Sequence, residues 1–227
     1  LYSPGDEACP MSLRLELVTE AARQALLLAS LSLPKQRSID LIGDKLGLSR
    51  AERVAVERIV RWPGEAIAAA VKKVPPEAVV GREIGIDGYN VIITVEAMLT
   101  GEPVFLCSDG FLRDLRGVFS SYKPSEVTPD ALKEIAEALK EVSPRRVVIA
   151  FDEPMSRSGE LAAMTRQILS EFNLTGDSLT HKQVDTFVAS HEVAASSDVA
   201  VIEKARCVLD LPELIAKRRG FTPKVIW

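Results

Sequence analysis

The stretch EIGIDGYNVIITVEAML, residues 83–99, decides the fold class of this chain. A short apolar run ends at Asp87 and Gly88, and an apolar segment of helical length follows it. That order predicts a buried strand, a turn and a buried helix. Residues 145–154, RRVVIAFDEP, form a second continuous apolar strand that ends in two acidic residues. Strands that are apolar throughout are typical of parallel sheets covered by helices on both faces.

The remainder of the chain after Pro75 and Pro76 alternates in a similar way. EPVFLCSDGFLRDL (102–115) predicts a hairpin that turns at residues 108–110, and helices are expected over 128–143 and 158–172. Further strands are expected at VDTFVAS (184–190) and CVLDL (207–211), followed by a last helix at 214–219. We therefore predict an α/β domain with a mostly parallel sheet flanked by helices over residues 80–227.

The front of the chain has a helical pattern instead. Apolar residues recur at helical spacing over 13–33, and a second helix follows Ser38. Ser49 has Glu52 three residues later, which is the capping-box arrangement that opens a helix. A fourth helix is expected over 65–74. The sequence thus predicts a small all-α domain at residues 11–76, with a loose tail at 1–10.

Residues 38–61 have the outline of a helix-turn-helix, because a short helix, a glycine-containing turn and a second helix follow one another. Four arginines of this segment could contact DNA phosphates: Arg50, Arg53, Arg58 and Arg61. The alternative is a helical bundle in which these arginines are solvated or pair with Glu52 and Glu57. Both interpretations stay open on the sequence.

The composition is that of a globular protein, with 47% hydrophobic and 26% charged residues and a net charge of -4. The charge is unevenly distributed along the chain. Residues 11–75 carry eleven Lys and Arg against seven Asp and Glu, whereas residues 76–227 carry seventeen against twenty-three. This asymmetry favours a front that faces nucleic acid and a rear that binds cations.

Several classes of protein are disfavoured. Cys9, Cys107 and Cys207 lack C-x-x-C spacing and are expected to be free thiols in a reducing compartment. No apolar run reaches the roughly 18 residues of a membrane helix, and no signal-peptide pattern is present, so we expect a cytoplasmic protein without membrane contact. The glycine-rich loops of nucleotide-binding proteins and the G-x-S-x-G elbow of serine hydrolases are also missing.

Acidic residues follow the ends of the predicted strands. Asp87 follows the first strand, Asp152 and Glu153 follow the strand at 147–151, and Asp198 opens the helix after VDTFVAS. Ligands of open α/β sheets bind at the carboxyl ends of the strands, and carboxylates brought together there need a cation. Mg²⁺ or Mn²⁺ suits such oxygen ligands and can orient a phosphodiester and activate water. Each acid alone could instead be a turn or cap residue.

Three motifs in this order resemble the NYN-domain nucleases of the PIN-like superfamily: IDGYNVI (86–92), VVIAFDE (147–153) and SSDVAVIEKA (196–205). The resemblance implies that Asp87, Asp152 and Asp198 bind one or two Mg²⁺ or Mn²⁺ ions and that RNA is hydrolysed. It also implies supporting roles for Asn90, beside the first acid, and for Ser197, beside the last. The whole chain, with its helical front, further resembles a largely archaeal family of unknown function.

The chain departs from the NYN pattern in places. Residues 101–127 have no clear counterpart there, and Glu153 and Pro154 stand where small residues are expected. Glu153 is an additional candidate metal ligand, and it competes as the fourth acid with three others: Asp109, Asp114 and Asp185. Candidates for guiding the phosphate backbone, or members of a solvated loop, are the polar residues after the hairpin: Arg113, Arg116, Tyr122 and Lys123.

The sequence therefore predicts a metal-dependent ribonuclease with RNA as its partner. One alternative is a regulator that binds nucleic acid through the helical front and has a catalytically silent PIN-like domain. Another is a hydrolase of small phosphate esters. Whether the chain forms a homo-oligomer is open at this point.

Overall fold

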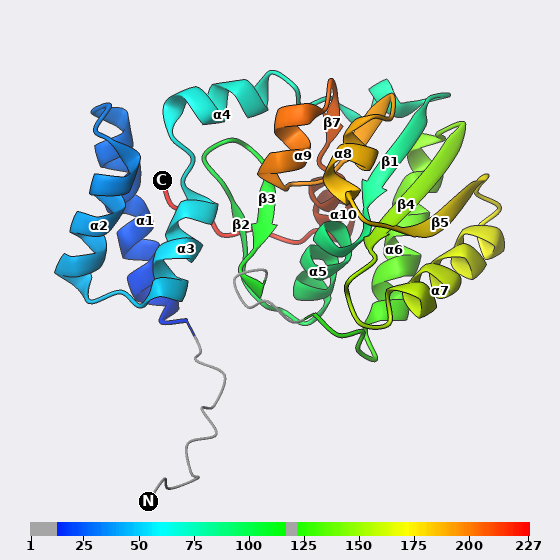
Figure 1. The fold of residues 1–227 in the computed structure, drawn as a ribbon, viewed down its shortest axis with the longest axis horizontal. Coiled ribbons are helices and arrows are strands. Elements are labelled where there is room, and N and C mark those ends of the chain that lie inside the picture. The colour runs from blue at the N-terminus through cyan, green and yellow to red at the C-terminus, as the bar shows by residue number, and fades with distance from the viewer. Residues whose placement is uncertain (1–12, 117–121) are drawn as a thin grey trace, which may run out of the picture.

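The computed structural model describes residues 13–116 and 122–227. Its centre is a five-stranded sheet of order β5-β4-β1-β6-β7 in which every neighbouring pair is parallel (Figure 1). The strands are β1 (Glu83–Asp87), β4 (Arg146–Asp152), β5 (Gly176–His181), β6 (Val193–Ala195) and β7 (Val208–Leu209). The expectation of an α/β protein with a mostly parallel sheet is confirmed.

The strand order has a switch point at its centre. The chain passes from β1 to β4 and β5 on one side, then crosses back to build β6 and β7 on the other side of β1. Doubly wound sheets bind ligands where the direction of winding reverses, beyond the carboxyl ends of the strands. The strands that precede Asp152, Asp87 and Asp198 are β4, β1 and β6, and they are direct neighbours at that point.

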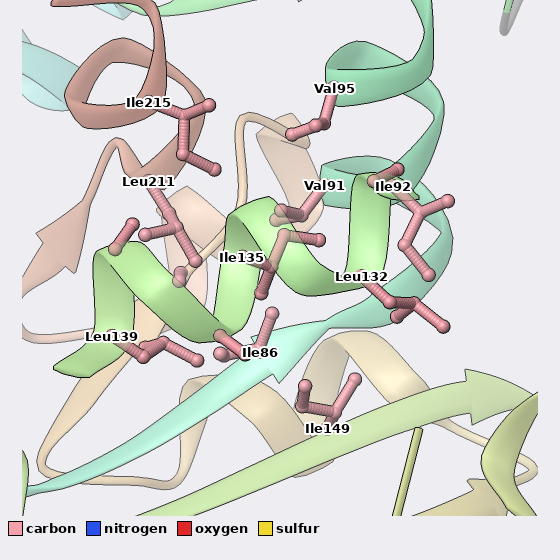
Figure 2. Close-up of a cluster of buried hydrophobic side chains, with 14 of the residues drawn as sticks. Ile86, Val91, Ile92, Val95, Leu132, Ile135, Leu139, Ile149, Leu211 and Ile215 are labelled. Atoms are coloured by element: carbon pink, nitrogen blue, oxygen red, sulfur yellow. The ribbon is translucent and has the colours of Figure 1, made fainter. Parts of the chain in front are cut away.

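Helices cover both faces of the sheet, because alternate residues of each buried strand point to opposite sides. Ile84, Ile86 and Ile149 pack against one layer of helices: α5 (Gly88–Leu99), α6 (Thr128–Val142), α7 (Ser158–Glu171) and α10 (Leu211–Arg219). Figure 2 shows Ile86 and Ile149 beneath side chains of α5, α6 and α10. Ala150 and Ala194 face the other layer, formed by α8 (Val184–Ala189) and α9 (Val199–Lys204).

The predicted hairpin is confirmed as a separate antiparallel pair, β2 (Val104–Leu106) and β3 (Leu112–Asp114). It lies between the α/β layers and the helical front (Figure 1). Phe105, Cys107 and Leu115 of the hairpin region belong to the apolar core of the front helices, and so does Ile226 near the C-terminus. The hairpin thus joins the two parts of the molecule.

The front consists of α1 (Leu15–Ser30), α2 (Lys35–Leu46), α3 (Arg50–Ile59), α4 (Pro63–Ala70) and the short 3-10 helix η1 (Pro76–Val79). The capping box is confirmed, because Ser49 Oγ accepts from the backbone of Glu52 while Glu52 Oε2 accepts from Ser49 N at 2.8 Å. The helices expected over 11–76 therefore form, but they share their core with the hairpin. The tail expected at 1–10 lies outside the described residues.

One predicted strand is wrong. VDTFVAS forms helix α8, in which Val184 and Val188 are buried four residues apart on one helical face. The strand of this region is β6, a few residues later, and β5 was not predicted because GDSLTH is a mostly polar edge strand. Cys107 and Cys207 are free thiols, as expected, and no helix of the described residues is both long and apolar enough to cross a bilayer.

Candidate functional site

Asp87 lies at the centre of the site. It ends β1 and caps α5, where its Oδ1 accepts from Asn90 N at 3.2 Å and its Oδ2 accepts from Ser196 Oγ at 3.1 Å. The residue is only 6% exposed. The pKa of this carboxyl is raised to about 7, chiefly by burial and also by the nearby carboxylates of Asp198 and Asp152, while the two hydrogen bonds oppose the shift.

Asp152 ends the neighbouring strand β4 and lies opposite His181 of β5 in the sheet register. Burial raises its pKa, and the negative charges of Asp185 and then Asp198 add to the effect. Asp185 belongs to α8, the helix that the sequence did not predict. Asp198 and Asp152 therefore act on Asp87, and Asp185 and Asp198 act on Asp152, at the carboxyl edge of the sheet.

The alternative fourth acids are placed differently. Glu153 is exposed, and its backbone N donates to His181 O at 3.1 Å. Asp109 is buried and bound by both terminal nitrogens of Arg113, at 2.8 and 2.7 Å. Asp114 is buried and accepts from Thr94 Oγ1 at 2.8 Å. Asp185 is the only one of these candidates whose charge raises the pKa of Asp152, and its Oδ2 also lies 3.8 Å from Lys204 Nζ.

A tightly bonded turn holds Asp198. Asp198 caps α9 by accepting from Ala200 N at 2.7 Å, and its own N donates to Ser196 Oγ at 2.9 Å. Asn90 Oδ1 accepts from both the N and the Oγ of Ser197, at 2.7 and 3.1 Å. Asn90 therefore supports the first acid through its backbone and the turn before Asp198 through its side chain.

The capping roles considered for Asp87 and Asp198 are real, because both residues cap the helix that follows them. Each cap uses one carboxylate oxygen as acceptor from a backbone N–H. A carboxylate has acceptor capacity beyond one such bond. Capping fixes the direction of these side chains and is compatible with a role at the site.

The three basic residues expected at the substrate are not brought together. Arg113 is 1% exposed, and in addition to Asp109 it donates from Nε to Ser197 O at 2.8 Å, so it positions the turn before Asp198. Arg116 instead pairs with Glu96 and Glu102 at the far end of α5. Lys123 is exposed in the loop before α6.

The arginines of the predicted helix-turn-helix segment have two different kinds of surroundings. Arg53 bonds back to α2, with Nη2 at 2.7 Å from Asp44 Oδ1. Arg58 and Arg61 instead line a cavity that is shared with Ser197 and Asp198. Sequence reasoning missed this meeting of the front and the acidic edge, because nothing in local spacing shows which distant helix packs against the site.

The donor chemistry of the acids fits a hard cation such as Mg²⁺ or Mn²⁺, which takes carboxylate oxygens. A buried carboxyl surrounded by further carboxylates, as Asp87 is, gains most from such an ion. Across residues 13–116 and 122–227, however, no three His, Cys, Asp or Glu side chains are grouped as a ready-made metal site. Asp87, Asp152, Asp185 and Asp198 are the residues that would hold it.

Fold and site together define a doubly wound α/β protein with acidic residues at the ends of neighbouring strands around its switch point. The chain belongs to the family described as Domain of unknown function (DUF5616), whose model matches residues 76–214. It is similar to Uncharacterized protein MJ0935 of Methanocaldococcus jannaschii, with 30% identity over 179 residues that cover 78% of this chain and 86% of the relative. No solved structure matches the chain.

Proposed function

We propose that this protein is a metal-dependent ribonuclease of the PIN/NYN type that acts in the cytoplasm. One observation carries the proposal: Asp152, Asp87 and the turn that holds Asp198 lie at the ends of three neighbouring strands at the switch point of the sheet, where the charges of Asp198 and Asp152 raise the pKa of the buried Asp87. A protein stabilised only by capping and packing has no need to collect like charges there. A site that cleaves a polyanion with the help of bound cations does need several carboxylates close together.

The roles follow from the contacts. Asp87, Asp152 and Asp198 hold one or two Mg²⁺ or Mn²⁺ ions, with Asp185 as the fourth acid in preference to Glu153. The ion, when bound, neutralises charge on the scissile phosphodiester and favours attack by water. Asn90 and Ser196 orient Asp87, while Arg113 and the side chain of Asn90 hold the turn that carries Asp198.

The test is cleavage of a labelled mixed-sequence RNA with Mn²⁺ or Mg²⁺. Asp87→Asn and Asp198→Asn should each abolish metal-dependent cutting, because each removes a charged ligand. Asp130→Asn is the matched control, since Asp130 is an exposed acid in the first turn of α6 and should leave cutting unchanged.

Cutting that survives both substitutions would place the activity elsewhere. Binding of RNA by the wild type without any cutting would replace the ribonuclease by a nucleic-acid-binding protein with a silent site. Turnover of nucleotides or sugar phosphates but not of RNA would make the protein a small phosphate-ester hydrolase.

A further inference from the structure

A cavity of about 190 Å³ opens between the helical front and the acidic edge of the sheet. Its front wall consists of α3 and the residue two positions beyond it: Val54, Glu57, Arg58 and Arg61. Its rear wall consists of Arg113 and the start of α9: Ser197, Asp198 and Val199. One of the proposed metal-binding acids therefore faces two arginines from a part of the chain far away in sequence.

Arg58 and Arg61 are held in place at this cavity by contacts that leave them donors to offer. Arg58 donates from Nε to Asp114 O at 2.8 Å and lies with Nη2 3.5 Å from Asp114 Oδ2. The Nη2 of Arg61 lies 2.9 Å from Glu65 Oε2. A guanidinium has five N–H donors, so each arginine can bind another acceptor without giving up these contacts.

Arg113, the third arginine of the cavity, differs from these two. Its Nε and both terminal nitrogens are bonded to Ser197 and Asp109 inside the protein. It therefore connects the rear wall to the hairpin, and Arg58 connects the front wall to the same hairpin through Asp114. Both walls are fixed to one rigid element, which preorganises the cavity between them.

We infer that α3 is one wall of the substrate cleft, and that Arg58 and Arg61 bind a backbone phosphate of a single polynucleotide strand whose neighbouring phosphate lies at Asp198. This inference rests on the proposed function. Arginine matches the geometry of phosphate better than lysine does. An anionic strand that approaches several carboxylates also needs cations beside them, and these arginines are the ones that the cavity supplies.

A single strand fits this cavity better than a duplex, because protein closes it on two sides, along α3 and along the turn before α9. The front would then act without inserting a recognition helix into a groove. The inward contacts of Arg53, which turn it toward α2, agree with this.

Val54 offers a clean test, because it lines the cavity, is 45% exposed and has no side-chain charge to lose. We expect Val54→Glu to raise the Kd for a labelled single-stranded RNA about fivefold and Val54→Lys to lower it by a similar factor, since each adds one charge beside a bound phosphate. Anisotropy at low salt measures both, with Ca²⁺ in place of Mg²⁺ or Mn²⁺ to slow cutting while a divalent ion is kept at the acids.

Leu41→Glu and Leu41→Lys are the matched controls. Leu41 is 63% exposed on α2 and lies outside the lining of the cavity, so these variants change the net charge equally. They should alter the Kd by less than about twofold. Arg61→Gln should weaken binding as Val54→Glu does and reduce the slope of log K against log salt by about 0.7, the value of one phosphate on a single strand.

The inference would be overturned if the Glu and Lys variants of Val54 and of Leu41 changed the Kd for RNA equally, or if the wild type did not bind RNA. Tighter binding of a duplex than of a single strand would overturn it as well. Equal binding of single-stranded DNA and RNA would support contact with phosphates. If the Val54 variants cut RNA as fast as wild type does, α3 is not a wall of the substrate cleft, but the proposed ribonuclease still stands. If the Val54 variants change RNA binding but the wild type does not cut RNA, the binding surface stands and the proposed ribonuclease is refuted.

Discussion

The molecule contains two kinds of buried acid, and they are handled in opposite ways. Asp109 is bound by Arg113, Asp210 lies 3.2 Å from Lys73 Nζ, and Glu52 is held by Arg14. Asp87 is equally buried, yet it forms no ion pair with any described residue and has Asp198 and Asp152 as its charged neighbours. Asp109, Asp210 and Glu52 are each paired with a cation of the protein, whereas the charged neighbours of Asp87 are carboxylates, and the proposed cation site rests on this difference.

The largest effect is expected from breaking a neutralised pair. Arg113→Met should lower the free energy of unfolding by about 3–5 kcal/mol, because it leaves the Asp109 carboxylate buried without its partner. Urea denaturation measures the loss. The double variant Arg113→Met with Asp109→Leu should recover a large part of it, and failure to recover would mean that Arg113 acts mainly through Ser197.

A smaller loss is expected at Glu52, which lies in the capping box and beside Arg14. Glu52→Gln should cost about 1–2 kcal/mol, since a charge-assisted contact and half of a cap are weakened. The contacts with Arg14 lower the pKa of Glu52 from 4.5 to about 2, so its extra stability is present above pH 4.5 and is lost as the pH falls toward 2. Wild type and variant should therefore converge in acid, and a constant difference would contradict this account.

An effect of the opposite sign is expected at Asp87. Its pKa is raised from 3.8 to about 7, so the folded state binds the proton more tightly and wild type loses stability as the pH rises from 3.8 through 7. With chelator present, Asp87→Asn should be as stable as wild type in acid and more stable than wild type near pH 8, because the asparagine has no proton to lose. Thermal melting across this range tests it, and a clear loss of stability at pH 8 would show that Asp87 serves the fold.

Much of the fold could be predicted from local pattern. The apolar runs that became β1 and β4, the hairpin and the capping box at Ser49 each depend on a few adjacent residues. The segment VDTFVAS could not be assigned from its composition, because β-branched and aromatic residues suit a strand as well as a short buried helix. The strand GDSLTH was hidden by its polarity at the sheet edge.

The positions of the acids along the chain could also be read from the sequence, but not their arrangement in space. Acids after strands were visible in the sequence, but their convergence depends on the strand order, which the sequence does not state. Asp185 was only one of several candidates, because it reaches the site on the unpredicted helix α8. Arg58 and Asp198 line one cavity because the front packs against the hairpin, so no spacing along the chain could have shown it.

The strand order also fixes when the site can exist during synthesis. The ribosome delivers β1 first, yet β1 ends up in the middle, with β4 on one edge and β6 on the other. A nascent chain that stops before residue 193 has β1 with one edge unpaired, which is a surface prone to pairing with other chains. Asp87 therefore waits for Asp198 while the residues between them are synthesised, and the growing chain cannot bring these two acids together before β6 has been made.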